Sequence, residues 1–128
     1  MTVPLPDFAR ALIDGPSYAT VASLEEDGSP QLSVVWVRRD GDDVLFSTLA
    51  GRRKALNWAR DPRASLLIFD PEEQERYAEL RGTVTVVHDP GGSLIHELAR
   101  KYTGAERFEG PTDGRVIVRL HTERVVLH

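Results

Sequence analysis

The residues best suited to chemistry lie in one short run, Ser47-Thr48-Leu49-Ala50-Gly51-Arg52-Arg53-Lys54, where hydroxyls leave a predicted strand and three cations open a predicted helix. A helix start already carries about half a positive charge, so each cation there costs some tenths of a kcal/mol, roughly 0.3 or more. A bound anion removes that cost, because free backbone N–H groups and guanidinium groups would both face it. The run therefore predicts a phosphate or carboxylate site. The alternative is a solvated charged turn whose arginine stems cover apolar surface.

A second candidate surface is the strand predicted to precede this run. Gln31, Ser33, Val35 and Val37 share one face of it, and Leu32, Val34 and Trp36 share the other. A flat ring could lie against such a strand and accept hydrogen bonds from its backbone. A strand in a barrel wall with one side facing solvent shows the same alternation. The alternation alone favours this structural role over a ligand-binding one.

Hydrolytic and metal-binding patterns are missing from the sequence. His96-Glu97-Leu98-Ala99 begins like a zinc protease motif, but Arg100 stands where the second histidine is required. The chain has neither a Gly-x-Ser-x-Gly elbow nor a cysteine. We therefore expect no metal site, and we find no nucleophile or acid–base pair that could carry a reaction by itself.

Length and composition exclude several classes of protein. The chain has 128 residues, 16 Lys and Arg against 20 Asp and Glu, a net charge of −4 and no cysteine. It predicts one domain, residues 1–128, without disulfides or cysteine zinc sites. An acidic total opposes a nucleic-acid-binding surface, which needs cations to displace counterions. The apolar runs are short and the N-terminus lacks the pattern of a secretory leader, so we expect a cytoplasmic protein without a membrane partner.

Hydrophobic periodicity gives the elements that must position these residues. Helices are predicted over Asp7–Asp14, Gly51–Arg60 and Ser93–Thr103, and a surface loop over 105–114. Strands are predicted over Tyr18–Leu24, Gln31–Arg38, Asp43–Thr48, Ala64–Phe69, Tyr77–His88 and Arg115–Leu127, the last bent at Thr122. Short strands with inserted helices predict a mainly β fold, a six-stranded antiparallel barrel with three to four helices.

Particular residues refine these elements. Gly82 falls in the middle of a strand, where a bulge or a barrel corner is the usual reason for a glycine. The second helix is expected to turn Ala55, Leu56 and Ala59 inward. Ser93 is expected to cap the third helix at its N-terminus.

Several short motifs, taken in order, resemble a known group of proteins. They are Ala-Thr-Val-Ala (19–22), Asp-Gly-Ser-Pro-Gln (27–31), Gly-Arg-Arg-Lys (51–54), Asn57, Arg-Asp-Pro-Arg-Ala (60–64), Tyr-Ala-Glu-Leu-Arg-Gly-Thr (77–83) and Arg-Val-Ile-Val-Arg-Leu (115–120). In this order and spacing the chain resembles the small deazaflavin (coenzyme F420)-dependent oxidoreductases of the pyridoxamine-phosphate-oxidase-like, FMN-binding split-barrel superfamily. The similarity covers nearly the whole chain and rests on the order of the motifs, since no single motif is specific.

The resemblance implies a split β-barrel homodimer with two cofactor sites in the clefts between subunits. It implies that Arg52 and Lys54 hold the cofactor phosphate and that Ser47, Thr48 and Asn57 line the same cleft. The strand of Gln31, Ser33 and Val35 would lie with its backbone along the tricyclic ring. The chain ends without the C-terminal extension that pyridoxamine phosphate oxidases proper place around their substrate, so that activity is not expected.

These observations predict an F420-dependent reductase that passes a hydride from the reduced deazaflavin to a conjugated or quinone-like small-molecule acceptor. A cofactor that does the difficult chemistry explains the lack of a visible nucleophile. Arg53, together with Arg38 or Arg60, could serve the polyglutamate tail, which carries more anions than the one phosphate of FMN. Two alternatives remain open, an FMN-binding flavin reductase or oxidase of the same fold, and a non-catalytic carrier of a cofactor or tetrapyrrole.

Overall fold

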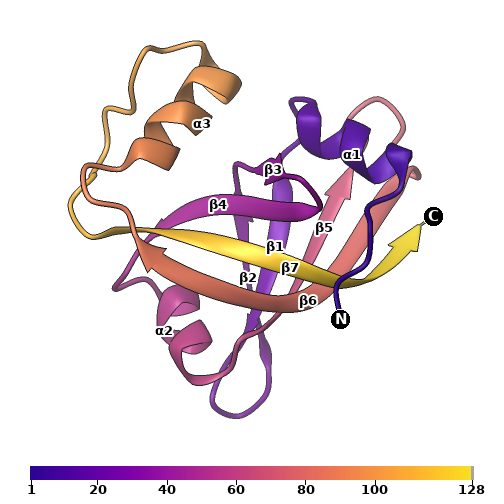
Figure 1. The fold of residues 1–128 in the computed structure, drawn as a ribbon, viewed down its shortest axis with the longest axis horizontal. Helices are drawn as coiled ribbons and strands as arrows, with labels where there is room; N and C mark the ends of the chain where they lie inside the picture. The colour runs from indigo at the N-terminus through magenta and orange to yellow at the C-terminus, as the bar shows by residue number, and fades with distance from the viewer. Residues whose placement is uncertain (128) are drawn as a thin grey trace.

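The computed structural model describes residues 1–127 as three helices around one antiparallel sheet (Figure 1). The helices are α1 (Asp7–Asp14), α2 (Arg53–Arg60) and α3 (Ser93–Thr103). The strands are β1 (Ala19–Leu24), β2 (Pro30–Val35), β3 (Arg38–Asp40), β4 (Asp43–Leu49), β5 (Arg63–Phe69), β6 (Tyr77–His88) and β7 (Arg115–Leu127). Their order across the sheet is β2-β1-β5-β6-β7-β4-β3. The prediction of a mainly β fold is confirmed, and so is the predicted loop over residues 105–114.

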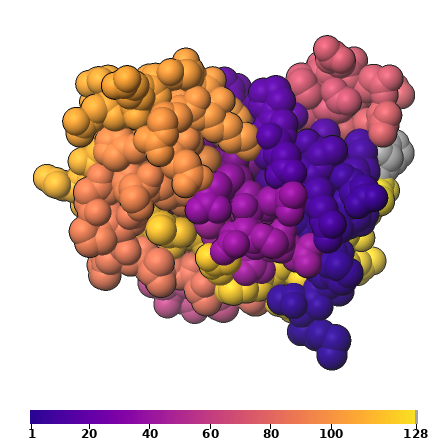
Figure 2. All heavy atoms as spheres, turned by 45° about the horizontal axis from the view of Figure 1, so that its top comes forward, coloured from indigo at the N-terminus to yellow at the C-terminus, as the bar shows by residue number. Residues whose placement is uncertain are grey.

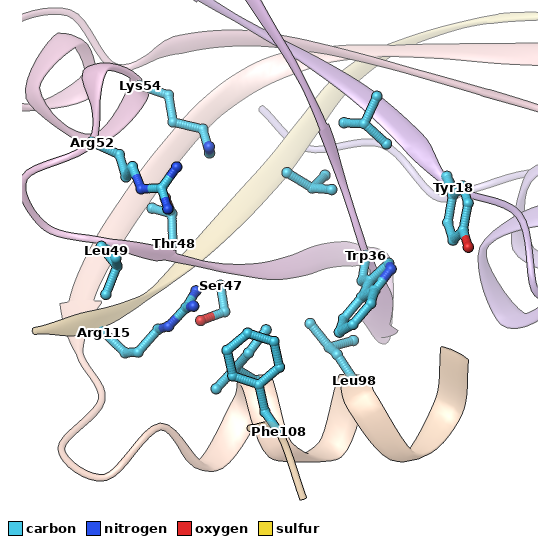
Figure 3. Close-up of a pocket in the computed structure, with 13 residues that line it drawn as sticks. Tyr18, Trp36, Ser47, Thr48, Leu49, Arg52, Lys54, Leu98, Phe108 and Arg115 are labelled. Atoms are coloured by element: carbon cyan, nitrogen blue, oxygen red, sulfur yellow. The ribbon is translucent and has the colours of Figure 1, made fainter. Parts of the chain in front are cut away.

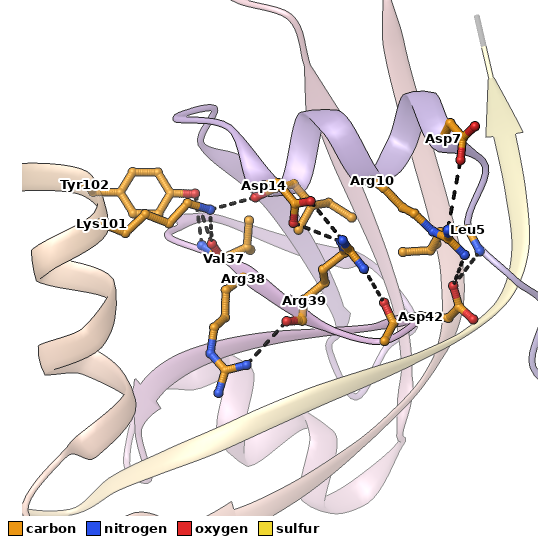
Figure 4. A network of polar contacts seen from close by, with 12 residues as sticks. Leu5, Asp7, Arg10, Asp14, Val37, Arg38, Arg39, Asp42, Lys101 and Tyr102 are labelled. Carbon is orange, nitrogen blue, oxygen red and sulfur yellow. Dashed lines mark hydrogen bonds and ion pairs between the residues drawn. The ribbon is translucent and has the colours of Figure 1, made fainter.

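The prediction of six strands is wrong by one, because the run from Gln31 to Arg38 divides into β2 and β3 at opposite edges of the sheet. The division falls at Val37, whose backbone groups bind side chains of α3. The N–H of Val37 donates to the Tyr102 hydroxyl (3.2 Å), and Lys101 Nζ donates to the Val37 carbonyl (2.7 Å) (Figure 4). The chain therefore leaves one edge of the sheet and joins the other at this point.

The sheet does not close into a complete barrel through hydrogen bonds. Within residues 1–127, β2 pairs only with β1 and β3 only with β4, so both are edge strands. The main core fills the interior with side chains of the sheet, α1 and α2, including Ile13, Phe46, Trp58, Leu66 and Leu120. A second cluster of Leu45, Leu94 and Leu98 joins α3 to β4. Figure 2 shows the orange α3 region beside the purple β3–β4 hairpin on the molecular surface.

The glycine in the middle of β6 marks a bulge, as predicted. Gly82 pairs with Thr122, while Arg81 pairs with Arg124, so Glu123 is the extra residue of β7. A Cβ atom at Gly82 would lie 1.9 Å from the carbonyl oxygen of His121. Only glycine permits this approach of the two backbones, and the long β6–β7 ladder bends here.

The buried face of α2 differs from the predicted one. Ala55 is buried as expected, but Leu56 and Ala59 are exposed, and Asn57 and Trp58 are buried in their place. Trp58 packs against Phe46 and donates from Nε1 to the carbonyl of Arg63 (3.1 Å). The anchoring aromatic ring thus rotates the helix away from the orientation that Leu56 would give.

The N-terminus of α3 is capped by a residue other than Ser93. Asp89 accepts hydrogen bonds from the backbone N–H groups of Ser93 (3.1 Å) and Leu94 (2.9 Å) and from the Ser93 hydroxyl (2.7 Å). Gly92, in the left-handed conformation with φ 71°, lets the chain turn back so that Asp89 can reach the helix. The predicted bounds of α1 and α3 are confirmed, and no helix within residues 1–127 is long and apolar enough to cross a membrane.

Candidate functional site

A pocket of about 250 Å³ lies between α2, α3 and the adjoining ends of β2, β4 and β7 (Figure 3). One end is cationic and carries Arg52, Lys54 and Arg115. The other end is aromatic and carries Tyr18, Trp36 and Phe108, with the hydroxyl residues Ser47 and Thr48 on β4 between the two ends. The pocket therefore joins a region suited to anions to one suited to flat apolar rings.

The three cations of the pocket lack carboxylate partners in the described part of the chain. None of Arg52, Lys54 and Arg115 forms an ion pair within residues 1–127, whereas Arg119, elsewhere on β7, binds Asp40 and Asp43 at 2.9 and 3.0 Å. Burial lowers the pKa of the Lys54 ammonium, and the charges of Arg52 and Arg115 lower it further. Like charges held this close repel one another, and a bound anion would relieve that repulsion.

The start of α2 adds to the positive potential at this end. Arg52 is the N-cap residue, with φ −70° and ψ 153°, and no side chain caps the helix. No acidic residue lies in the first turn. The free N–H groups of a first helical turn and its dipole both favour an anion, so the backbone and the cationic side chains act in the same direction.

The hydroxyls of β4 lie beside the cations. Thr48 is buried, and the Ser47 Oγ atom is buried without a hydrogen-bond partner in residues 1–127. Leu49 pairs with Arg115 on β7, which fixes the cationic end relative to these hydroxyls. A buried hydroxyl without a partner costs free energy, roughly 1–3 kcal/mol, unless a ligand or water accepts its hydrogen.

The aromatic end is a stack built from segments that are distant in sequence. The Tyr102 ring lies parallel to Trp36, with centroids 5.5 Å apart and an interplanar angle of 9°, and it also stacks on Tyr18 at 5.5 Å. Phe108 meets Trp36 edge-on at 6.2 Å. Tyr18 remains 58 % exposed, so the pocket opens to solvent on this side.

The pocket gathers five of the eight residues that were predicted to bind a cofactor. They are Ser47, Thr48, Arg52, Lys54 and Val35. The first four are close in sequence, and the turn from β4 into α2 brings them together. Val35 joins them from the last position of β2.

The other three predicted residues lie outside the pocket. The Ser23 hydroxyl donates to Gln31 Oε1 (2.8 Å) and accepts from Asn57 Nδ2 (3.0 Å), so Gln31 and Asn57 connect β2, β1 and α2. Ser33 Oγ is buried and has no hydrogen-bond partner in residues 1–127. The semi-polar face of β2 thus faces inward, and its apolar face, with Leu32 and Val34, faces solvent.

The arginines considered for an acidic tail are already engaged. Arg38 forms an ion pair with Glu97 of α3, and Arg53 lies 3.5 Å from Glu25. Arg60 donates to the carbonyl of Leu24. Each would have to exchange a partner within the chain for a ligand.

Sequence reasoning missed eight residues that line the pocket, among them Arg115, Phe108, Trp36 and Tyr18. Arg115 reaches the site through the pairing of β7 with β4, and Phe108 comes from the loop between α3 and β7. Trp36 was placed with Leu32 and Val34 on the apolar face of one continuous strand, but β2 ends at Val35, before that residue. One feature of the sequence could have indicated Arg115 as a site residue. It is a cation at the start of an apolar strand, where its charge has no obvious partner.

Two histidines of the described chain form hydrogen bonds within the protein. His96 Nδ1 accepts a hydrogen bond from the N–H of Phe108 (2.9 Å), and His121 lies 3.0 Å from the Thr85 hydroxyl. Within residues 1–127, no three His, Asp or Glu side chains come together in a way that could hold a metal ion. Cations, hydroxyls and aromatic rings line the pocket instead.

Comparisons with known proteins identify the fold and the family. A solved structure named F420 Reductase superposes with a TM-score of 0.86 at 30 % sequence identity, covering 95 % of this chain and 98 % of that one. A conserved hypothetical protein from Mycobacterium tuberculosis (TM-score 0.77, 24 % identity, 97 % and 84 % covered) and General Stress Protein 26 from Bacillus anthracis (0.73, 13 %, 94 % and 91 %) share the fold. The family model described as Pyridoxamine 5'-phosphate oxidase matches residues 5–128. With this coverage, the chain belongs to the pyridoxamine 5'-phosphate oxidase family.

Proposed function

We propose that the protein is an F420-dependent oxidoreductase that transfers a hydride from the reduced deazaflavin to a conjugated or quinone-like acceptor. The observation that carries this proposal is the pocket itself, where cations without carboxylate partners adjoin an aromatic wall. The deazaflavin cofactor F420 has the same two parts, a phosphate and a flat tricyclic ring. The similar solved structure named F420 Reductase supports the proposal.

The residues present fit such a cofactor. Arg52 and Lys54 would hold its phosphate, and the partnerless Ser47 hydroxyl would donate to an oxygen of the same ligand. Trp36 and the end of β2 at Val35 would lie beside the ring. When bound, a reduced deazaflavin supplies a hydride from its ring C5.

The chain's own part in the reaction is to bind and orient. The fixed cations set the position of the phosphate, and the aromatic wall sets the plane of the ring, so an acceptor can stack on its free face. Apolar side chains of α3, such as Leu98, keep water from that part of the pocket. Within residues 1–127 the pocket lining includes no carboxylate or histidine, so the proton that the oxidised deazaflavin releases would reach the reduced acceptor through solvent at the open side of the pocket.

FMN is the second candidate cofactor, and membership of a family named for a flavin-type oxidase favours it. The 30 % identity to the solved structure named F420 Reductase, over 95 % of this chain, favours the deazaflavin. Under the FMN alternative the protein would be a flavin reductase or oxidase. The same pocket would be used in both cases.

We further propose that two copies of the chain complete the site. At about 250 Å³ the pocket is smaller than ligand sites of roughly 300–1,000 Å³. It opens at Tyr18 and Val34, and Val34 belongs to an apolar sheet face that also exposes Leu32, Leu67 and Phe69. A second copy packed on this face would bury it and provide the missing wall.

A fluorescence titration with F420 and, separately, with FMN tests the cofactor. We expect tight binding of F420 and weaker binding of FMN, and steady consumption of reduced F420 when a quinone is added. Binding without any turnover would instead identify a carrier. Failure of both ligands to bind would refute the proposed function.

The variants Arg52→Ala and Lys54→Ala test the location of the site. Each should weaken F420 binding by about 1–3 kcal/mol, because each removes a charge-assisted hydrogen bond. Arg124→Ala, an exposed position of β7 away from the pocket, is the matched control and should bind as the wild type does. Unchanged affinity in both site variants would remove these residues from the site.

A further inference from the structure

Arg115 is the most buried cation of the pocket, and its charge is not neutralised by the described chain. The residue begins β7 and is only 9 % exposed, whereas Arg52 is exposed and Lys54 is half-buried. Its Nε donates a hydrogen bond to the carbonyl of Pro111 (2.9 Å). No carboxylate within residues 1–127 forms an ion pair with it, and a charge buried in this way is unfavourable unless something pairs with it.

The guanidinium group is held in a fixed position. The Phe108 ring lies under it, with Cζ 5.1 Å from the ring centroid, and Pro111 accepts from its Nε edge. Figure 3 shows the terminal nitrogens directed into the pocket, on the side of Ser47. A side chain that is already ordered loses little conformational entropy when it binds a ligand.

Arg119 on the same strand shows what a purely structural arginine looks like here. It binds Asp43 and Asp40, and these hydrogen bonds raise the pKa of its guanidinium. The pKa of Arg115 shifts the other way, because burial and the neighbouring charge of Arg52 both lower it. The environment of Arg115 therefore works against its charge for as long as no anion is present.

Ser47 provides a second group without a partner at the same place. Its Oγ is buried and makes no hydrogen bond within residues 1–127. In the β4–β7 ladder Ser47 pairs with Ile117 and Leu49 with Arg115, so Ser47 and Arg115 lie on the same face of the sheet. A donor without an acceptor and a cation without an anion thus line one cavity.

We infer that Arg115 binds the anion of the ligand directly, as a third cation beside Arg52 and Lys54, and that Ser47 donates its hydroxyl to the same group. A phosphate ester is the chemical class that fits, because its oxygens can accept from guanidinium groups, an ammonium and a hydroxyl together. The assignment of this phosphate to F420 rests on the proposed function. The phosphate site itself can be tested without it.

The first test measures the Tm of the full chain in inorganic phosphate against chloride at equal ionic strength. Phosphate should raise the Tm of the wild type, because it binds the folded state. Arg115→Gln should weaken the apparent phosphate affinity by about 10- to 100-fold, and Arg115→Lys by less, since it keeps the charge. Arg124→Gln is the control and should respond as the wild type does. An Arg115→Gln response equal to that of the wild type would overturn the inference.

The second test separates this inference from the proposed function. The wild type and Arg115→Gln are titrated with F420 and with its deazariboflavin core, which lacks the phosphate. We expect the ratio of the two affinities to fall by about tenfold or more in the variant, while core binding stays unchanged. Equal loss for both ligands would indicate a structural role and overturn the inference. A phosphate response that weakens in Arg115→Gln, in a protein that binds neither deazaflavin, would support the inference and refute the proposed function.

Discussion

At the scale of single residues, the site is defined by charge that the chain leaves unbalanced. Most arginines of this acidic protein have carboxylate partners, as Arg39 has Asp14 and Arg81 has Glu79. The three cations of the pocket have none within residues 1–127, and the chain bears the resulting repulsion. Such an arrangement favours binding of an anion over stability of the free protein.

Lys54 makes this repulsion measurable as a dependence on pH. Burial, then Arg52 and Arg115, lower its pKa below the ordinary value of 10.5. A bound anion favours the charged ammonium, so F420 affinity should fall as the pH rises through the lowered pKa. In the free protein the same shift makes folding stability rise with pH between the lowered pKa and 10.5, because the unfolded chain then holds more protons.

Lys54→Arg is the matched control for this pH dependence, because a guanidinium stays charged across the whole range. Titrations of both proteins from pH 7 upward should show a decline in affinity for the wild type and a flatter curve for the variant. Parallel curves would mean that the ligand or another group titrates. Lys54 would then not be the source of the decline.

Part of the site could be predicted from sequence because part of it is local. Ser47, Thr48, Arg52 and Lys54 follow one another through a single strand-to-helix turn, so their proximity requires no knowledge of the fold. Arg115 meets them only because β7 pairs with β4 in one particular register. A pattern of alternation predicts each strand, but it does not reveal which strands pair.

At the scale of elements, the division of β2 from β3 also depends on contacts between segments that are distant in sequence. Residues 31–38 alternate as a continuous strand would, and nothing local interrupts them. The interruption comes from Tyr102 and Lys101, which bind the backbone of Val37 across 65 and 64 positions of sequence. β2 is therefore an edge strand, and its apolar face with Leu32 and Val34 is exposed to solvent.

The bulge between β6 and β7 was predicted from Gly82 in the sequence. Its geometry gives a testable prediction about the stability of the fold. Gly82→Ala should destabilise the fold by about 1–3 kcal/mol or more, because the new Cβ would lie 1.9 Å from the His121 oxygen and neither backbone can move freely. Chemical denaturation followed by tryptophan fluorescence measures the change.

Gly51→Ala is the matched control for Gly82→Ala. Its φ is not positive, and a Cβ there would meet no atom within 4 Å. We expect its free energy of unfolding to stay near that of the wild type or to rise slightly, since alanine restricts the unfolded chain. Equal destabilisation by the two substitutions would show that the bulge does not require glycine.

At the scale of the whole molecule, the pocket and the apolar sheet face are continuous. Thr20 of β1 pairs with Val34 on one side and Leu67 on the other, so these two exposed side chains flank it on one face. Val34 also lines the pocket, where it opens to solvent. A surface that covered this face would therefore close the site as well, which connects the proposed dimer to the proposed activity.

The variant Leu67→Lys tests the dimer, because Leu67 lies in the apolar face but outside the pocket. The wild type should show twice the chain mass of 14.3 kDa by light scattering, and the variant should shift towards one chain mass, since a buried lysine without a partner opposes association. Val87→Lys, at an exposed apolar position near the end of β6, should remain dimeric. If Leu67→Lys is monomeric and binds F420 more weakly, both chains form the site. If the wild type is itself monomeric and binds F420 tightly, the whole site lies within one chain.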